Sequence, residues 1–142
     1  MKKSPDNGFY PMKDISRFVI IDDDPVNNAL CKMIINLALG KMDVKTFTLP
    51  EKGFQFIKTE YTMNMNGSTS IILLDLNMPI MSGWEFLEHF EELDEVIKKQ
   101  VKIYILSSSV DPRDKERAGK NKNVEDYIMK PLTKEIVLEI TS

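Results

Sequence analysis

The chain has 142 residues, of which 42% are apolar and 29% are charged, a size and composition typical of one globular domain with a hydrophobic core. Its 19 basic and 22 acidic side chains leave a net charge of −3 without any basic block, which argues against direct binding of nucleic acid. One cysteine excludes an internal disulfide, and the lack of a long apolar run argues against a membrane helix or a signal peptide, so we expect a cytoplasmic protein without membrane insertion.

Residues 1–16 are polar and are interrupted by Pro5, Gly8 and Pro11, a pattern that predicts a flexible arm. Apolar residues become dense only from Phe18 onward. The folded domain is therefore expected to span residues 17–142.

The first regular elements are a strand and the helix that follows it. The run Phe18–Ile21 is apolar and rich in β-branched residues but too short for a helix, which predicts a buried strand. The strand ends at the acids Asp22, Asp23 and Asp24, and Asp24 with the proline after it is suited to cap and begin a helix. A helix up to Gly40 is indicated by the apolar repeat of Val26, Leu30, Met33, Ile34 and Leu37.

The same pairing of a strand with a helix recurs along the rest of the chain. Further strands are predicted at residues 43–49, 71–74, 103–106 and 127–129. Helices are predicted to begin at Pro50, near Ser82, at Asp111 and after Thr133. The helix from Ser82 is expected to have an inner face made of Phe86, Leu87, Phe90, Leu93 and Ile97.

Five strands that alternate with five helices predict an α/β fold. Because most of the strands are apolar throughout, helices should cover both faces of a parallel sheet. Right-handed crossovers then lead to a doubly wound, three-layer α/β/α sandwich with a five-stranded sheet. In such a sheet ligands bind beyond the carboxyl ends of the strands, which is where we expect the functional residues.

Side chains able to do chemistry stand at four of these strand ends. Asp22 and Asp23 follow the first strand, Asp75 the third, Ser107 the fourth and Lys130 the fifth. Three carboxylates at one edge would repel one another unless a cation lay between them. Mg²⁺ takes one or two carboxylates together with phosphate oxygens and water, and its charge plus that of the lysine balances the three acids.

This set of residues suits phosphoryl transfer, which needs an in-line nucleophile, a cation and donors to the transferred group. Asp75 is expected to be the nucleophile, while Asp23 and Asp75 hold the metal. Lys130 and the Ser107 hydroxyl would contact phosphoryl oxygens, and the small side chain of Ser108 would leave the phosphoryl group room.

Four sequence motifs resemble those of one protein family. They are Ile21-Asp22-Asp23-Asp24-Pro25, Leu74-Asp75-Leu76-Asn77-Met78-Pro79-Ile80-Met81-Ser82-Gly83, Leu106-Ser107-Ser108 and Tyr127-Ile128-Met129-Lys130-Pro131. Each motif is weak alone, but all four occur in the correct order and each stands at a predicted strand end. From about Arg17 to its C-terminus the chain resembles the receiver domain of bacterial two-component response regulators, in a stand-alone form like the chemotaxis regulators.

The resemblance implies a flavodoxin-like sheet with strand order 2-1-3-4-5. It also implies that Asp75 is the phosphorylation site. Asp22 and Asp23 would be the acids of the metal site, with the backbone carbonyl of Asn77 as a further ligand and Mg²⁺, or alternatively Mn²⁺, as the ion. Lys130 would be the lysine of the family pattern, followed by a proline in a linkage that is often cis.

By the same resemblance, phosphorylation would act as a switch through Ser107 and Tyr127. The phosphoryl group would draw the loop after the fourth strand toward itself, and Tyr127 would rotate toward the core. The face formed by the fourth predicted helix, the fifth strand and the fifth predicted helix would then bind a different partner.

The expected partners are a histidine kinase or histidine phosphotransfer protein as phosphoryl donor and a downstream protein that reads the switched face. Since little length remains after the last predicted helix, we expect a response regulator without an output domain. It would not be an enzyme, apart from catalysing its own Mg²⁺-dependent phosphorylation and dephosphorylation. Two positions depart from the family pattern: Ser82 replaces an aspartate before the glycine, and Ser107 replaces the more frequent threonine but keeps the hydroxyl.

Three alternatives remain open. An aspartyl-phosphate phosphatase of the haloacid dehalogenase type would need a second aspartate two residues after the nucleophile, where this chain has Asn77. A flavin- or nucleotide-binding domain would need a glycine-rich or hydroxyl-rich loop after the first strand, where this chain has acids. A receiver-fold module that binds partners without phosphorylation is disfavoured by the intact acids, hydroxyl and lysine.

Overall fold

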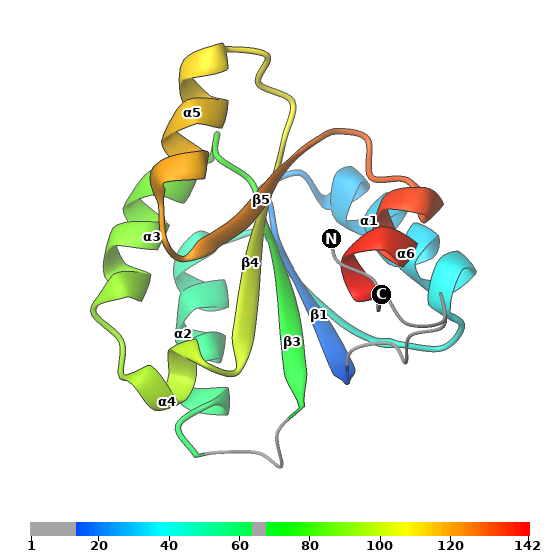
Figure 1. The fold of residues 1–142 in the computed structure, drawn as a ribbon, viewed down its shortest axis with the longest axis horizontal. Helices are drawn as coiled ribbons and strands as arrows, with labels where there is room; N and C mark the ends of the chain where they lie inside the picture. The colour runs from blue at the N-terminus through cyan, green and yellow to red at the C-terminus, as the bar shows by residue number, and fades with distance from the viewer. Residues whose placement is uncertain (1–13, 64–67) are drawn as a thin grey trace, which may run out of the picture.

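A computed structural model of the protein describes residues 14–63 and 68–142. Five parallel strands form one sheet with the order β2-β1-β3-β4-β5 (Figure 1). The strands are β1 (Ile15–Ile21), β2 (Asp43–Phe47), β3 (Thr69–Leu74), β4 (Val101–Ser107) and β5 (Val124–Met129). The helices are α1 (Pro25–Leu39), α2 (Pro50–Glu60), α3 (Gly83–Glu91), α4 (Glu95–Lys98), α5 (Pro112–Lys120) and α6 (Lys134–Thr141). The predicted doubly wound sandwich and its strand order are confirmed.

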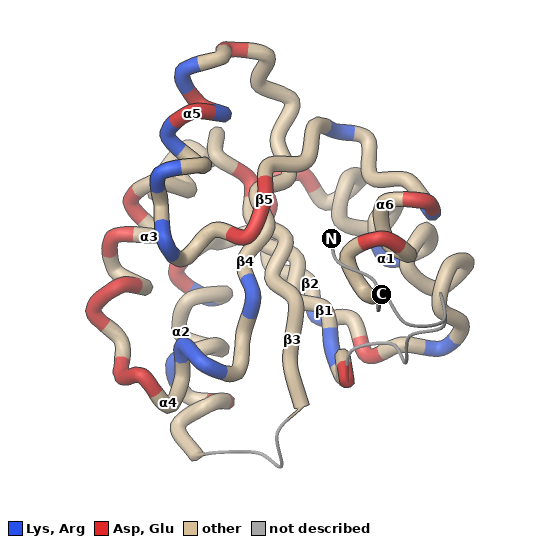
Figure 2. Tube along the Cα trace, viewed as in Figure 1, with Lys and Arg blue, Asp and Glu red and all other residues tan. Residues whose placement is uncertain are grey.

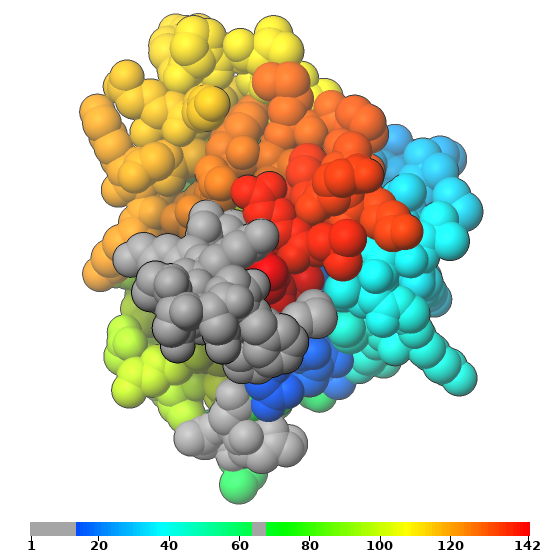
Figure 3. Space-filling model, turned by 45° about the vertical axis from the view of Figure 1, so that its right-hand side comes forward, coloured from blue at the N-terminus to red at the C-terminus, as the bar shows by residue number. Residues whose placement is uncertain are grey.

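Helices cover both faces of the sheet, which explains why its strands are apolar throughout (Figure 1). Val19 and Ile21 of β1 belong to a hydrophobic cluster shared with α2, α3, α4 and α5. Phe18 and Ile20 of the same strand belong to a second cluster shared with α1 and α6. In Figure 3, α6 (red) and α1 (cyan and light blue) form adjoining parts of the surface, in keeping with their mutual packing. None of the helices in the described ranges is long and apolar enough to span a bilayer.

Strand β1 begins at Ile15, two residues before the predicted start of the fold. Its first residues pair with the start of β3, where the backbone N–H of Thr69 also donates to the carbonyl of Asp14 at 2.9 Å. Residues 1–13, most of the predicted flexible arm, lie outside the described residues.

The single helix predicted from Ser82 is wrong, because the structure has two helices, α3 and the short α4. The chain leaves α3 after Glu91 and re-enters a helix with Asp94 as an extended N-cap. The Lys98 ammonium donates to the Glu91 carbonyl at 2.9 Å, which satisfies a backbone acceptor that a continuous helix would have used. The fourth and fifth predicted helices therefore correspond to α5 and α6.

Four of the five residues in the apolar repeat that predicted α1 face solvent, and only Ile34 packs against the core. Val26, Leu30, Met33 and Leu37 are 65%, 51%, 51% and 65% exposed. The buried residues of the helix are Asn28, Cys31 and Ile35. Cys31 and Ile35 belong to the cluster shared with the sheet and α6. The helix therefore presents an apolar stripe to solvent, formed by Val26, Leu30, Met33 and Leu37 and called the α1 stripe below.

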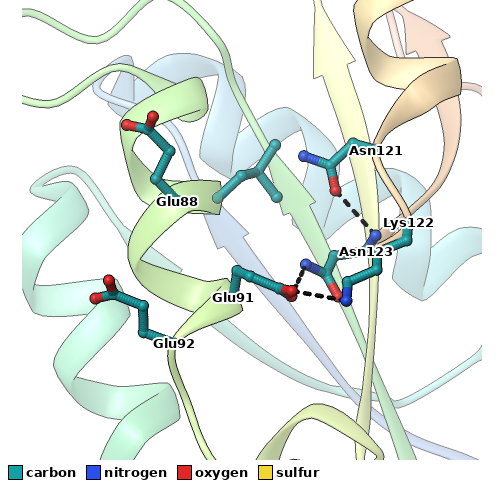
Figure 4. Close-up of a pocket in the computed structure, with 7 residues that line it drawn as sticks. Glu88, Glu91, Glu92, Asn121, Lys122 and Asn123 are labelled. Atoms are coloured by element: carbon teal, nitrogen blue, oxygen red, sulfur yellow. Dashed lines mark hydrogen bonds and ion pairs between the residues drawn. The ribbon is translucent and has the colours of Figure 1, made fainter.

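Polar contacts join α3 to the turn between α5 and β5. Acidic residues concentrate along α3 and in the segment between α3 and α4, and basic residues are frequent on α5 (Figure 2). The Glu91 carboxylate contacts the Lys122 ammonium at 2.7 Å and accepts from the Asn123 side chain at 2.8 Å. These residues line a pocket of about 420 Å³ between α3 and the α5–β5 turn (Figure 4). The side-chain hydrogen bonds from Asn123 and Lys122 lower the pKa of Glu91 to about 2, so the contact persists over the whole neutral range.

Candidate functional site

The carboxyl edge of the sheet gathers the three predicted acids. Asp22 and Asp23 follow β1, and Asp75 follows the neighbouring strand β3, where its backbone N–H donates to the carbonyl of Ile21 at 3.0 Å. Carboxylate oxygens of the three residues lie within 4.8 Å of one another. Asp22 and Asp75 are buried and Asp23 is exposed, so the cluster opens to solvent on one side. Its hard oxygen donors fit a small divalent cation such as Mg²⁺.

Lys130 reaches the same cluster from the end of β5. Its ammonium lies 2.7 Å from Oδ2 of Asp22 and 3.7 Å from Oδ1 of Asp75. The backbone N–H of Lys130 donates to the carbonyl of Ser107 at 2.9 Å, and the peptide bond to Pro131 is cis, as the resemblance implied. The structure thus brings together four of the predicted site residues from three strand ends.

The electrostatics of the site make Asp75 unusually easy to protonate. Burial, followed by the charge of Asp22, raises the pKa of Asp75 to about 6, while Lys130 and the backbone N–H groups of Asn77 and Leu76 act in the opposite direction. Burial acts to lower the pKa of Lys130, but its contacts with Asp22 and Asp75 outweigh this and raise it. The lysine therefore stays charged over the whole pH range in which Asp75 titrates.

That the backbone carbonyl of Asn77 is a metal ligand stays a prediction.

Asp22 is held by three donors besides Lys130, and none of these three contacts was predicted from the sequence. Its Oδ1 accepts from the backbone N–H of Asp24 at 2.9 Å, and its Oδ2 accepts from the Asn27 side chain at 2.9 Å. The Asn28 side chain donates to the Asp22 backbone carbonyl at 3.0 Å. The only sequence signal was a pair of asparagines in the first turn of a helix that follows an acidic strand end.

The predicted switch residues are connected through Ser109, for which no role was predicted from the sequence. The fully buried Ser107 hydroxyl accepts from the backbone N–H of Ser109 at 3.1 Å. The Tyr127 hydroxyl donates to the carbonyl of Ser109 at 2.8 Å, and the Ser109 hydroxyl donates to Asp114 of α5 at 2.6 Å. Ser108 is exposed beside them. One loop residue therefore contacts both predicted switch residues and α5.

The start of α3 lies directly against the strand end that carries Asp75. A Cβ atom on Gly83 would stand 2.5 Å from the backbone oxygen of Asp75 and 2.9 Å from Cα of Leu76. Ser82 caps the helix in a reciprocal pair of hydrogen bonds with Glu85, so serine serves here as a helix cap. The glycine is required for the close approach of α3 to the site.

Comparison with known proteins gives relatives in both sequence and structure. The cell cycle response regulators CtrA of Brucella ovis and Brucella abortus are each 34% identical over 121 residues, which make up 84% of this chain and 45% of each relative. The chain thus spans about 45% of the length of these relatives.

Solved structures agree with these relatives. A two component response regulator from Cytophaga hutchinsonii superposes with a TM-score of 0.79 at 29% identity, covering 90% of this chain and 94% of that one. A response regulator receiver protein from Dyadobacter fermentans superposes with a TM-score of 0.78 at 25% identity, covering 89% and 94% of the two chains. A family model described as the response regulator receiver domain matches residues 18–141. The chain therefore belongs to the response regulator receiver domain family.

Proposed function

We propose that this receiver domain works in a phosphorelay, in which Asp75 accepts a phosphoryl group from a histidine kinase or a histidine phosphotransfer protein. The supporting observation is the position of Asp75, a buried strand-end carboxylate with its Oδ1 3.7 Å from the Lys130 ammonium and two further carboxylates beside it. An aspartate with a purely structural role would gain no stability from other carboxylates so close to it. A phosphoryl acceptor needs cations nearby, and a group of carboxylates binds them.

In the proposed reaction, a carboxylate oxygen of Asp75 attacks phosphorus, and the bond between phosphorus and the donor's histidine nitrogen breaks. Asp22, Asp23 and Asp75, with the carbonyl of Asn77, would hold Mg²⁺, which when bound offsets negative charge on the phosphoryl oxygens. Lys130 turns from Asp22 toward a phosphoryl oxygen. Dephosphorylation is a separate step, in which water attacks phosphorus, the bond between phosphorus and the Asp75 oxygen breaks, and phosphate leaves. The chain therefore catalyses only its own phosphorylation and dephosphorylation.

The hydroxyl of Ser107 donates to another phosphoryl oxygen, and the exposed Ser108 leaves access to the site. Movement of Ser107 pulls on the backbone N–H of Ser109, whose carbonyl accepts from Tyr127. This connection supports coupling between the phosphoryl group and the face formed by α5, β5 and α6. A downstream protein would read that face.

A small phosphodonor tests the proposal. Incubation with acetyl phosphate and Mg²⁺ is expected to add one phosphoryl mass to the intact protein, and Asp75→Ala is expected to abolish the increment. Asp94→Ala, which removes an exposed aspartate at the start of α4, is the matched control and should be phosphorylated normally. Absence of the increment in the unaltered protein, or its persistence in Asp75→Ala, would contradict the proposal.

We further propose that the protein donor docks along the α1 stripe. Its four residues follow one another at spacings of four, three and four, the pattern that packs against a neighbouring helix. Val26 lies three residues after Asp23, a member of the acid cluster, so a helix seated on the stripe would run toward that cluster. The stripe thus offers an apolar surface that begins near the cluster containing the proposed phosphoryl acceptor.

Leu30→Glu is expected to separate docking from chemistry. Phosphorylation by acetyl phosphate should stay within about twofold of normal, because the acid cluster is untouched, whereas transfer from a histidine phosphotransfer protein that phosphorylates the unaltered chain should slow about 10-fold, the effect of losing one apolar anchor. Met63→Glu, which alters another exposed apolar residue beyond α2, is the control and should leave both rates unchanged. Normal protein-to-protein transfer in Leu30→Glu would exclude this docking surface.

A further inference from the structure

Asn27 makes a contact with the acid cluster that the proposed reaction does not yet use. It lies in the first turn of α1, and its side-chain amide donates to Oδ2 of Asp22 at 2.9 Å. The Lys130 ammonium contacts that same oxygen at 2.7 Å. Two donors, one neutral and one charged, therefore share one carboxylate oxygen of a residue that is almost fully buried.

The other oxygen of Asp22, Oδ1, accepts one hydrogen bond, from the backbone N–H of Asp24 at 2.9 Å, which leaves its second lone-pair site for the metal. A carboxylate oxygen has two lone-pair sites, so Asn27 and Lys130 together fill those of Oδ2. The Lys130 ammonium also lies 3.7 Å from Oδ1 of Asp75. Its position therefore depends on how strongly Asp22 attracts it relative to Asp75.

We propose that Asn27 is a positioning residue for Lys130. By donating to Oδ2 of Asp22, its amide offsets part of the negative charge there and weakens the hold of Asp22 on the lysine. The ammonium is then free to turn toward a phosphoryl group on Asp75. This inference rests on the proposed phosphorylation of Asp75 and assigns to Asn27 the control of its rate.

Substitution by aspartate distinguishes this role from a structural one. Asp has nearly the shape of Asn but cannot donate to Oδ2 of Asp22 and adds a like charge beside it, so Asn27→Asp is expected to be less stable than the unaltered protein whichever role is correct. A purely structural role predicts that the folded variant still reacts as fast as the unaltered protein. The positioning role predicts a slower reaction, because two adjacent carboxylates would hold the Lys130 ammonium in place of one.

The experiment compares Asn27→Asp, Asn27→Ala and Asn27→Gln with the unaltered protein. Phosphorylation by acetyl phosphate is followed at saturating Mg²⁺, and thermal unfolding is measured without donor. The maximal rate constant, measured at a temperature at which each variant is folded, is expected to fall about 10-fold in Asn27→Asp and about threefold in Asn27→Ala. Asn27→Gln, which keeps the amide on a longer side chain, should recover most of the rate lost in Asn27→Ala.

A double-mutant cycle tests whether Asn27 acts through the lysine. On a Lys130→Met background, Asn27→Asp should change the rate constant by less than about twofold, because no ammonium remains to be held. A full 10-fold loss on that background, or a normal rate constant in Asn27→Asp alone, would overturn the inference. Failure of the unaltered protein to be phosphorylated would instead overturn the proposed function, and this inference with it.

Discussion

Replacement of Lys130 with methionine is expected to slow phosphorylation of Asp75 by about 100-fold, the loss typical when one preorganised charged donor is removed from a transferring group. The ammonium is the single cation that the described residues place within 4 Å of both Asp22 and Asp75. Methionine keeps much of the length and apolar volume of the lysine stem, so the sheet edge should remain packed. Rates with acetyl phosphate at saturating Mg²⁺ measure the effect.

The same variant should change the titration of Asp75. Lys130 acts to lower the pKa of this carboxyl, which already stands at about 6, so its removal leaves burial and Asp22 unopposed and raises the pKa further. The attacking form is the carboxylate, so the metal-free variant should hold Asp75 protonated to a higher pH. Carbon NMR of the aspartate carboxyl groups in EDTA would show the shift.

Lys134→Met is the matched control, because Lys134 is an exposed lysine at the start of α6. It should leave both the rate and the titration unchanged. A Lys130→Met protein that is phosphorylated at the normal rate would show that the lysine only balances charge in the resting state.

Most of the candidate site could be predicted because its residues stand at the ends of strands or within two residues after them. Apolar runs end abruptly at Asp22, Asp75 and Lys130, and the parallel sheet brings these ends to one edge. The ends of the predicted strands were therefore enough to place the acids and the lysine at one edge of the sheet, without any knowledge of where their side chains point.

The features that were missed depend on where side chains point after packing. The repeat at Val26, Leu30 and Leu37 correctly indicated a helix, but which stripe faces inward is decided by α6, which packs against α1 from the far end of the chain. The end of α3 depends on a lysine side chain that reaches back to a backbone carbonyl. Asn27 and Ser109 act through hydrogen bonds to individual neighbours, which the periodicity of the sequence does not encode.

Gly83→Ala is expected to lower the free energy of unfolding by about 2–3 kcal/mol, in the upper part of the range for forcing an extra methyl group into a packed site. The added Cβ would stand 2.5 Å from the backbone oxygen of Asp75, and backbone atoms have no rotamer by which to withdraw. Helix propensity favours alanine by about 1 kcal/mol, so the clash must exceed this gain for the protein to be destabilised. Denaturant unfolding of the metal-free protein gives the difference directly.

Gly119→Ala provides the matched control, because Gly119 also lies in a helix but an added Cβ there would meet no atom within 4 Å. This variant should gain about 0.5–1 kcal/mol from helix propensity alone. The difference in stability between the two substitutions measures the cost of the close approach of α3 to the strand end, since the change in covalent structure is the same.

Relief of the clash requires α3 or the residues after β3 to move, so phosphorylation of Asp75 should slow in Gly83→Ala and remain normal in Gly119→Ala. Equal stability and equal rates in the two variants would show that α3 does not hold Asp75 in place.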